Sequence, residues 1–225
     1  MNRSTRSLLG ALSLICLIVT AIWLGLLIYG TLTRGAVESY AEALAHAAAL
    51  DLLDVITYVN AALITLTATM LFAGLYVLLR SEAPLWAAMG AVFVPIYGLL
   101  NLFAYLSQLT IVPRLAAMGP AFEPLLAQMV QAWPGSVVNI LNNLGYAVLG
   151  IPSIIFGVLL ARRAPSLQAG GILLAVSGAA SIAGIVGIAA QIAALALGSI
   201  VGGVLFLAAL IPLSVVWLRR ERPHP

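Results

Sequence analysis

The chain has 225 residues, of which 63% are hydrophobic and 8% are charged, and its formal net charge at pH 7 is +3. Soluble domains carry about 25% charged residues, so this composition excludes a soluble globular protein and indicates an integral membrane protein. All ten basic residues are arginine, which excludes a lysine Schiff base with retinal or pyridoxal phosphate. Because the arginines flank apolar segments rather than form a patch, no nucleic-acid partner is expected.

The chain begins with a short polar segment and an apolar run over residues 8–29. This pattern is similar to a secretory signal, whose apolar core is usually about 7–15 residues long and ends at a small-residue cleavage site. The run here is longer and no such site follows it, so we expect a retained first transmembrane helix. Its Cys16 is the one cysteine of the chain, which excludes an intrachain disulfide.

Further apolar segments follow, separated by breaks that contain arginine, proline or glycine. A helix needs about 20 apolar residues to cross the hydrocarbon core of a bilayer. The expected fold class is therefore an all-α, polytopic membrane helix bundle, with residues 1–225 forming one transmembrane domain. Its six predicted transmembrane helices cover residues 8–32, 55–79, 85–110, 137–161, 167–191 and 196–218.

The arginine positions support this helix count and predict an orientation. Cytoplasmic loops of membrane proteins are enriched in arginine and lysine. With six crossings and both termini in the cytoplasm, only Arg34 and Arg114 lie outside. The arginines inside are Arg3, Arg6, Arg80, Arg162, Arg163, Arg219, Arg220 and Arg222. This asymmetry predicts cytoplasmic N- and C-termini and a multi-pass location in the cytoplasmic (cell) membrane.

Two longer connections lie on the outer side in this topology. Residues 36–54 are rich in alanine and leucine and carry Glu38, Glu42 and His46 at intervals of one helical turn. This spacing favours a helix on the membrane surface or an outward extension of the second transmembrane helix. Residues 120–133 form a second amphipathic segment, and the two together predict a small helical cap.

The fifth predicted transmembrane helix is built largely from small residues. Ser177 and Ser181, and likewise Ala183 and Gly187, are four residues apart. This small-xxx-small spacing lets membrane helices approach one another closely. We expect the helix to pack tightly inside the bundle.

Polar side chains form stripes on the second, third and fourth predicted transmembrane helices. At about 100° per residue, the polar residues of each helix share one narrow face, mostly in the outer half of the membrane. These stripes predict an outward-facing polar pocket between the three helices, which would bind or help to transport a small molecule or lipid. The candidate ligand-binding residues are Asp54, Tyr58, Asn101, Tyr105, Gln108, Asn142, Asn143 and Tyr146.

The same residues are consistent with a purely structural role. Interhelical hydrogen bonds from asparagine and glutamine are common in membrane proteins and contribute only about 0.6 to 2 kcal/mol each. Tyrosines near the surface are typical of the interfacial aromatic belt, and Asp54 fits a helix N-terminal carboxylate as well as a functional acid. The alternative is therefore a structural or accessory membrane subunit whose polar groups only hold helices together.

An intramembrane enzyme is a second alternative, centred on Glu42, His46 and Asp54. Glu42 and His46 have the i, i+4 spacing of helical metal ligands, but a catalytic zinc site needs at least three protein ligands. No hydrolase or nucleotide-binding motif occurs in the sequence. We therefore predict no catalytic residue, no metal and no cofactor, and we expect the lipid bilayer and a small-molecule or lipid ligand as partners.

The organisation of the chain also resembles a known family. The second predicted transmembrane helix opens on an acidic residue in "LDLLD" and ends in "LYVLLR". Later comes "LGYAVLGIPSIIFGVLLARRAPSLQAGGILLAVSG", whose run from Gly157 to Gly178 is the most recognisable part. Over residues 45–185 this pattern resembles a bacterial family of small six-helix membrane proteins that is catalogued as a domain of unknown function. The resemblance implies a six-helix membrane fold and no particular activity or functional residue.

Overall fold

The computed structural model describes residues 3–219, and six of its helices are long and apolar enough to cross a membrane. No strand occurs in this described part of the chain, so the predicted all-α bundle with six spanning helices is confirmed. The spanning helices are α1 (Arg3–Arg34), α3 (Leu52–Leu79), α4 (Pro84–Thr110), α7 (Val137–Arg163), α8 (Pro165–Ala190) and α10 (Gly198–Leu218). The shorter helices are α2 (Tyr40–Ala48), α5 (Val112–Ala117), η1 (Pro120–Phe122), α6 (Glu123–Met129) and α9 (Ala193–Ala196).

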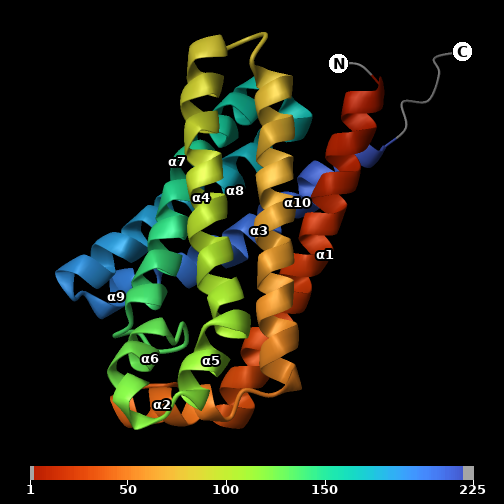
Figure 1. Ribbon diagram of the computed structural model, residues 1–225. Helices are drawn as coiled ribbons and strands as arrows, with labels where there is room; N and C mark the ends of the chain where they lie inside the picture. The colour runs from red at the N-terminus through yellow and green to blue at the C-terminus, as the bar shows by residue number, and fades with distance from the viewer. Residues whose placement is uncertain (1–2, 220–225) are drawn as a thin grey trace, which may run out of the picture.

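The spanning helices are arranged as two groups of different inclination. Helices α3, α4 and α7 stand side by side, with α1 against α3 on the flank. Helices α8 and α10 lie behind them and cross them obliquely, so that the turn at α9 lies at the side of the bundle (Figure 1). Because α8 packs against both α7 and α10, it joins the two groups.

The two ends of the bundle have different characters. One end holds the start of α1, the α3–α4 loop, the α7–α8 junction and the end of α10 (Figure 1). The described arginines at this arginine-rich end include Arg6, which donates to the carbonyl oxygens of Val216 and Arg219 at 3.1 Å each and so ties α1 to α10. An ion pair between Arg163 and Glu82 ties the end of α7 to the α3–α4 loop. Arg220 and Arg222 lie outside the described residues.

Helices α2, α5, η1 and α6 cover the opposite end and form the cap (Figure 1). The cap has a small apolar core of its own, to which Ala47, Leu115 and Leu126 contribute. The predicted outer segment over 36–54 is shorter in the structure, because α2 ends at Ala48 and α3 begins at Leu52. Both starts are fixed by reciprocal side-chain caps, Ser39 with Glu42 and Asp51 with Asp54.

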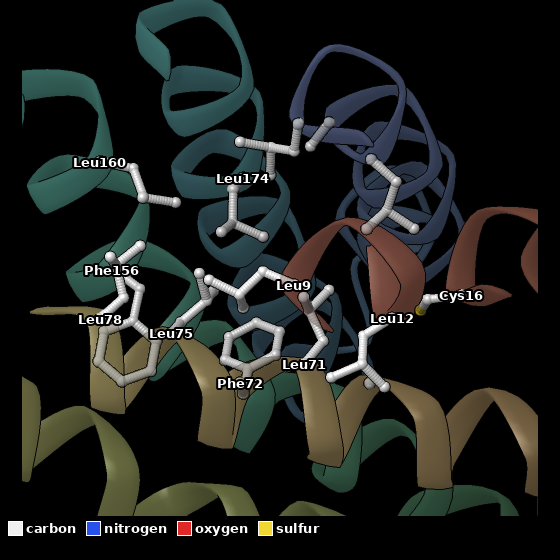
Figure 2. Packing of buried hydrophobic residues seen from close by; sticks show 14 of the residues in the cluster. Leu9, Leu12, Cys16, Leu71, Phe72, Leu75, Leu78, Phe156, Leu160 and Leu174 are labelled. Carbon is white, nitrogen blue, oxygen red and sulfur yellow. The ribbon is translucent and has the colours of Figure 1, made fainter. Parts of the chain in front are cut away.

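The main apolar core fills the half of the bundle towards the arginine-rich end (Figure 2). Phe72 of α3 is fully buried at its centre, with ring centroids 5.9 Å from Phe156 of α7 and 6.4 Å from Phe206 of α10. Leucines from α1, α3, α7 and α8 surround these rings (Figure 2). This half of the bundle is therefore closed by tightly packed apolar side chains.

Small residues bring α7, α8 and α10 into backbone contact. A Cβ placed on Gly171 would lie 2.5 Å from the Gly157 oxygen, and one on Gly178 would lie 2.4 Å from the Gly150 oxygen. The Ser177 hydroxyl donates to the Gly202 carbonyl oxygen at 2.8 Å and links α8 to α10. The predicted tight packing of the small-residue helix inside the bundle is thus present on two of its sides.

Candidate functional site

A cavity of about 280 Å³ lies at the capped end of the bundle, between α2, α3, α4 and α5. Its polar lining residues are Asp54 and Tyr58 of α3 and Gln108 of α4, and its apolar wall includes Leu50, Val55 and Leu109. We call this cavity the capped-end pocket. Its volume is just below the range of about 300–1,000 Å³ that is typical of small-molecule sites, and its mixed lining suits a ligand with an apolar body and one polar group.

The Asp54 carboxylate is held in place by neighbours at the start of α3. One oxygen accepts a hydrogen bond from the Arg34 guanidinium at 2.8 Å, and the other accepts one from the backbone N–H of Asp51 at 3.1 Å. Arg34 also binds Asp51 at 2.6 Å. Of the two interpretations that the sequence left open, the structure places Asp54 as a helix N-terminal carboxylate, yet one that also lines a cavity.

The ion pair makes stability depend on pH. The Arg34 guanidinium, with help from the backbone N–H groups of Asp54 and Leu53, lowers the pKa of Asp51 below its ordinary value of 3.8. A depressed folded-state pKa stabilises the protein above the unfolded-state pKa, and this stabilisation is lost as the pH falls through the folded-state value. We expect the melting temperature to fall when the pH is lowered from 6 to below about 4, and to fall less in Arg34→Gln. An identical pH profile for parent and variant, measured by thermal shift, would contradict this assignment.

Tyr58 and Gln108 both line the capped-end pocket, but they differ in their hydrogen bonding. The Tyr58 side chain is 5% exposed, and its hydroxyl forms no hydrogen bond with any residue in the range 3–219. The Gln108 amide donates to the carbonyl oxygens of Ala104 and Met129 and accepts from the backbone N–H of Gln131 at 3.0 Å. The hydrogen bonds of Gln108 therefore hold its side chain in place and anchor the cap to α4. The Tyr58 hydroxyl, by contrast, is available to a ligand.

Four other candidate residues lie deeper and form a separate group. The Tyr105 hydroxyl of α4 donates to Asn142 Oδ1 of α7 at 3.3 Å and also hydrogen-bonds the Tyr146 hydroxyl. The Tyr97 ring lies 6.5 Å from that of Tyr146, and Asn101 is fully buried beside them. We call Tyr97, Asn101, Tyr105, Asn142 and Tyr146 the tyrosine–asparagine cluster.

The eight candidate residues therefore do not line one common cavity. Asp54, Tyr58 and Gln108 face the capped-end pocket, whereas Asn101, Tyr105, Asn142 and Tyr146 belong to the tyrosine–asparagine cluster. Asn143 joins neither group, because its amide donates to the Asn139 carbonyl and side-chain oxygens one turn earlier on α7. The pocket is walled by the cap rather than by the fourth spanning helix α7, which the polar stripes had predicted.

Sequence reasoning missed two contributors to the pocket. The sequence predicted only that Arg34 lies on the outer side of the membrane, yet Arg34 forms an ion pair with Asp54. The cap supplies Ala47, Ala48, Pro113 and Ala116 to the wall. The S-x-x-E and D-x-x-D patterns that begin α2 and α3 were the available signals, since such capping boxes mark helix starts.

Two of the three residues of the enzyme alternative, Glu42 and Asp54, have structural partners, whereas the buried Nε2 atom of His46 has none among the described residues. The Glu42 carboxylate accepts hydrogen bonds from the backbone N–H groups of Glu38 and Ser39 at 2.7 and 3.1 Å. Asp54 is paired with Arg34. Within residues 3–219, no group of three or more histidine, cysteine, aspartate or glutamate side chains is arranged to hold a metal ion.

These features define the class of the protein as a multi-pass helical membrane protein with a cavity of mixed lining beneath a cap. Comparison of the chain with protein-family models, curated proteins and solved structures finds no match. The resemblance to the six-helix family of unknown function therefore stays a prediction.

Proposed function

We propose that the protein binds a small amphipathic molecule in the capped-end pocket, with the cap on the outer side of the cell membrane. The orientation is supported by the segregation of Arg6, Arg80, Arg162 and Arg163 at the other end, because arginine is enriched in cytoplasmic loops. In this orientation the pocket receives its ligand from outside, as expected for a binding or transport-related protein.

The observation that carries the proposal is the Tyr58 hydroxyl. The residue is 5% exposed as a whole, it lines the cavity, and its hydroxyl has no hydrogen-bond partner among the described residues. The hydroxyl oxygen keeps accessible surface inside the cavity, and a typical hydrogen bond between it and a ligand group contributes about 0.5–1.5 kcal/mol. Tyr58 is thus the residue most suited to recognise the polar group of a ligand.

The charges around the pocket favour a neutral or cationic polar group. Asp51, Asp54 and Arg34 carry two negative charges and one positive charge, so this group has a net charge of −1. An anionic ligand would be repelled by the surplus carboxylate, whereas an ammonium group would be attracted to it. The apolar wall of Leu50, Val55 and Leu109 suits a compact hydrocarbon or aromatic body.

Three probes with one aromatic body test this proposal: benzylamine, benzyl alcohol and benzoate. Binding to the purified protein in nanodiscs is measured by equilibrium dialysis, and thermal stabilisation provides a second readout. We expect benzylamine to bind most tightly and benzoate least tightly. Tyr58→Phe should weaken binding of benzylamine about tenfold, which corresponds to the loss of one hydrogen bond, without changing the fold.

Tyr29 provides the matched control, because it is a tyrosine on the exposed face of α1 and lies 58% exposed. Tyr29→Phe removes the same hydroxyl and should leave probe binding unchanged. If none of the three probes binds, or if Tyr58→Phe and Tyr29→Phe bind benzylamine as tightly as the parent, the proposal is wrong.

A structural or accessory subunit is a second candidate, and Gln108 is the observation that favours it. All the hydrogen bonds of its side chain are made within the chain, including those that fasten the end of α6 and the residues directly after it to α4. In that case Tyr58→Phe would alter thermal stability while no probe binds, and the protein would co-purify with a partner.

A further inference from the structure

The wall of the capped-end pocket is not equally buried on all sides. Ala47 of α2 and Gln108 of α4 are both buried, so the pocket is closed towards the cap and towards the centre of the bundle. Val55 of α3 lines the same pocket yet is 42% exposed, and Pro113 of α5 is exposed as well. The pocket therefore has an open side between the start of α3 and the junction of α4 with α5.

This open side lies on the flank of the bundle, where α3 and α4 stand side by side (Figure 1). On α3, Val55 is followed one turn further by Val59, which is exposed and does not line the pocket. On α4, Leu106 is exposed three residues before the pocket-lining Leu109. Lipid chains solvate apolar side chains on the outside of spanning helices. The open side is thus flanked by side chains that face lipid.

The depth of the open side follows from the length of α3. This helix has 28 residues, and at about 1.5 Å per residue its length of about 42 Å matches the thickness of a bilayer with its headgroup regions. With α3 centred, a hydrocarbon layer about 30 Å thick begins about 6 Å from the start of the helix. Val55 lies about 5 Å from that start. The open side therefore lies where lipid headgroups meet the hydrocarbon.

The polar groups of the pocket lie on its inner side. At about 100° per residue, Asp54 and Tyr58 are about 40° apart around α3, and both are buried. Val55 is turned from Asp54 by about 100° and from Tyr58 by about 60° in the opposite sense. A ligand whose head group contacts both polar residues therefore has its remaining part directed past Val55 and out towards the lipid.

The size of the pocket limits how much of such a ligand it encloses. Its volume of about 280 Å³ is below the range that is typical of sites for whole small molecules. It holds a small head group and the first part of one hydrocarbon chain, and the rest of a longer chain has to remain outside. Outside the open side that chain meets lipid, so it is not exposed to water.

We propose that the ligand of the capped-end pocket is a single-chain aliphatic amine, which enters sideways from the outer leaflet of the membrane. Its ammonium group lies beside Asp54 and Tyr58, and its chain leaves past Val55 into the lipid between α3 and α4. The ammonium group complements the net charge of −1 of Asp51, Asp54 and Arg34. Each CH₂ group favours the membrane by about 0.8 kcal/mol, so the leaflet concentrates this amine. The inference rests on the proposed amine binding and adds the ligand class and its route.

Displacement of radiolabelled benzylamine from the full chain in phosphatidylcholine nanodiscs tests the inference. The competitors are octadecylamine, octadecanol and stearate, each dosed as a mole fraction of the lipid. About 0.5 M salt screens the charge that the amine adds to the membrane surface, whereas buried charges are screened much less. We expect octadecylamine to displace benzylamine at a mole fraction at least tenfold below that of octadecanol, and stearate to leave it bound. A pocket closed to the lipid would exclude the long chain.

Two tryptophan variants test the route. Val55→Trp places a large side chain in the open side, and it should weaken octadecylamine at least tenfold more than it weakens benzylamine. Val77→Trp is the matched control, because Val77 is 48% exposed on the same helix but lies near the arginine-rich end. It should leave the binding of both amines unchanged.

Failure of this inference is distinguishable from failure of the proposed function. If benzylamine binds the parent and octadecylamine does not displace it, sideways entry is overturned while amine binding in the pocket stands. The same holds if octadecylamine binds Val55→Trp and Val77→Trp equally well. Displacement by octadecanol or stearate as effective as that by octadecylamine would overturn the amine as ligand class. If benzylamine does not bind the parent, the proposed function is wrong and this inference is overturned with it.

Discussion

Gly171→Ala is expected to lower the free energy of unfolding by about 1–3 kcal/mol, the usual cost of overpacking a close contact. A Cβ at this position would lie 2.5 Å from both the Ala161 nitrogen and the Gly157 oxygen, which are backbone atoms of α7. Backbone atoms cannot rotate away as a side chain does, so α7 and α8 must separate. The measurement is an unfolding titration with SDS in mixed micelles.

Gly25 gives the control for this substitution. A Cβ there meets no atom within 4 Å, and alanine has a higher helix propensity than glycine by up to about 1 kcal/mol. Gly25→Ala should therefore leave the stability unchanged or raise it. Equal effects of the two substitutions would show that α7 and α8 do not meet at Gly171.

Phe72→Ala is expected to have the largest effect of any single substitution, a loss of about 2–4 kcal/mol. Truncation of a buried phenylalanine costs about 3–5 kcal/mol in soluble cores, and the cost is smaller here because lipid also solvates apolar surface. What remains is the loss of packing against Phe156 and Phe206. The same SDS titration measures it.

Phe103→Ala is the matched control, since Phe103 of α4 is 43% exposed on the outside of the bundle. Its truncation leaves no internal cavity and should cost less than about 1 kcal/mol. Comparable losses for Phe72→Ala and Phe103→Ala would contradict the position of the apolar core.

The fold was predictable because its strongest signals are local. Apolar runs long enough to cross a bilayer define the spanning helices, and the small residues around Ser177 and Ser181 predict close packing. The errors lie at the ends of helices. The start of the second spanning helix was expected at residue 55, whereas Asp51 caps α3 and its first residue is Leu52. A helix cap is a polar residue in a short break, and hydropathy alone does not detect it.

The candidate site was predictable only in part. A polar stripe shows which residues share one face of a helix, but it does not show which other segment of the chain that face contacts. Periodicity placed Tyr105 and Gln108 on one face of the third predicted helix, but Gln108 binds Met129 at the end of α6 and Gln131 after it, whereas Tyr105 binds α7. Which helix lies opposite a stripe depends on tertiary packing. Arg34 and Asp54 are 20 residues apart in the chain, so their pairing was not recognisable from spacing. The contribution of the cap likewise depends on tertiary packing.

The anchoring of the cap by Gln108 has a consequence for the order of events during synthesis. Its partners Met129 and Gln131 lie 21 and 23 residues further along the chain. At about 5–20 residues per second, the ribosome adds them only seconds after α4 is complete. Until then the Gln108 side chain has only Ala104 and Ser107 of its own helix as partners. The hydrogen bonds that join the cap to α4 therefore form only after α2 and α4 have both been synthesised.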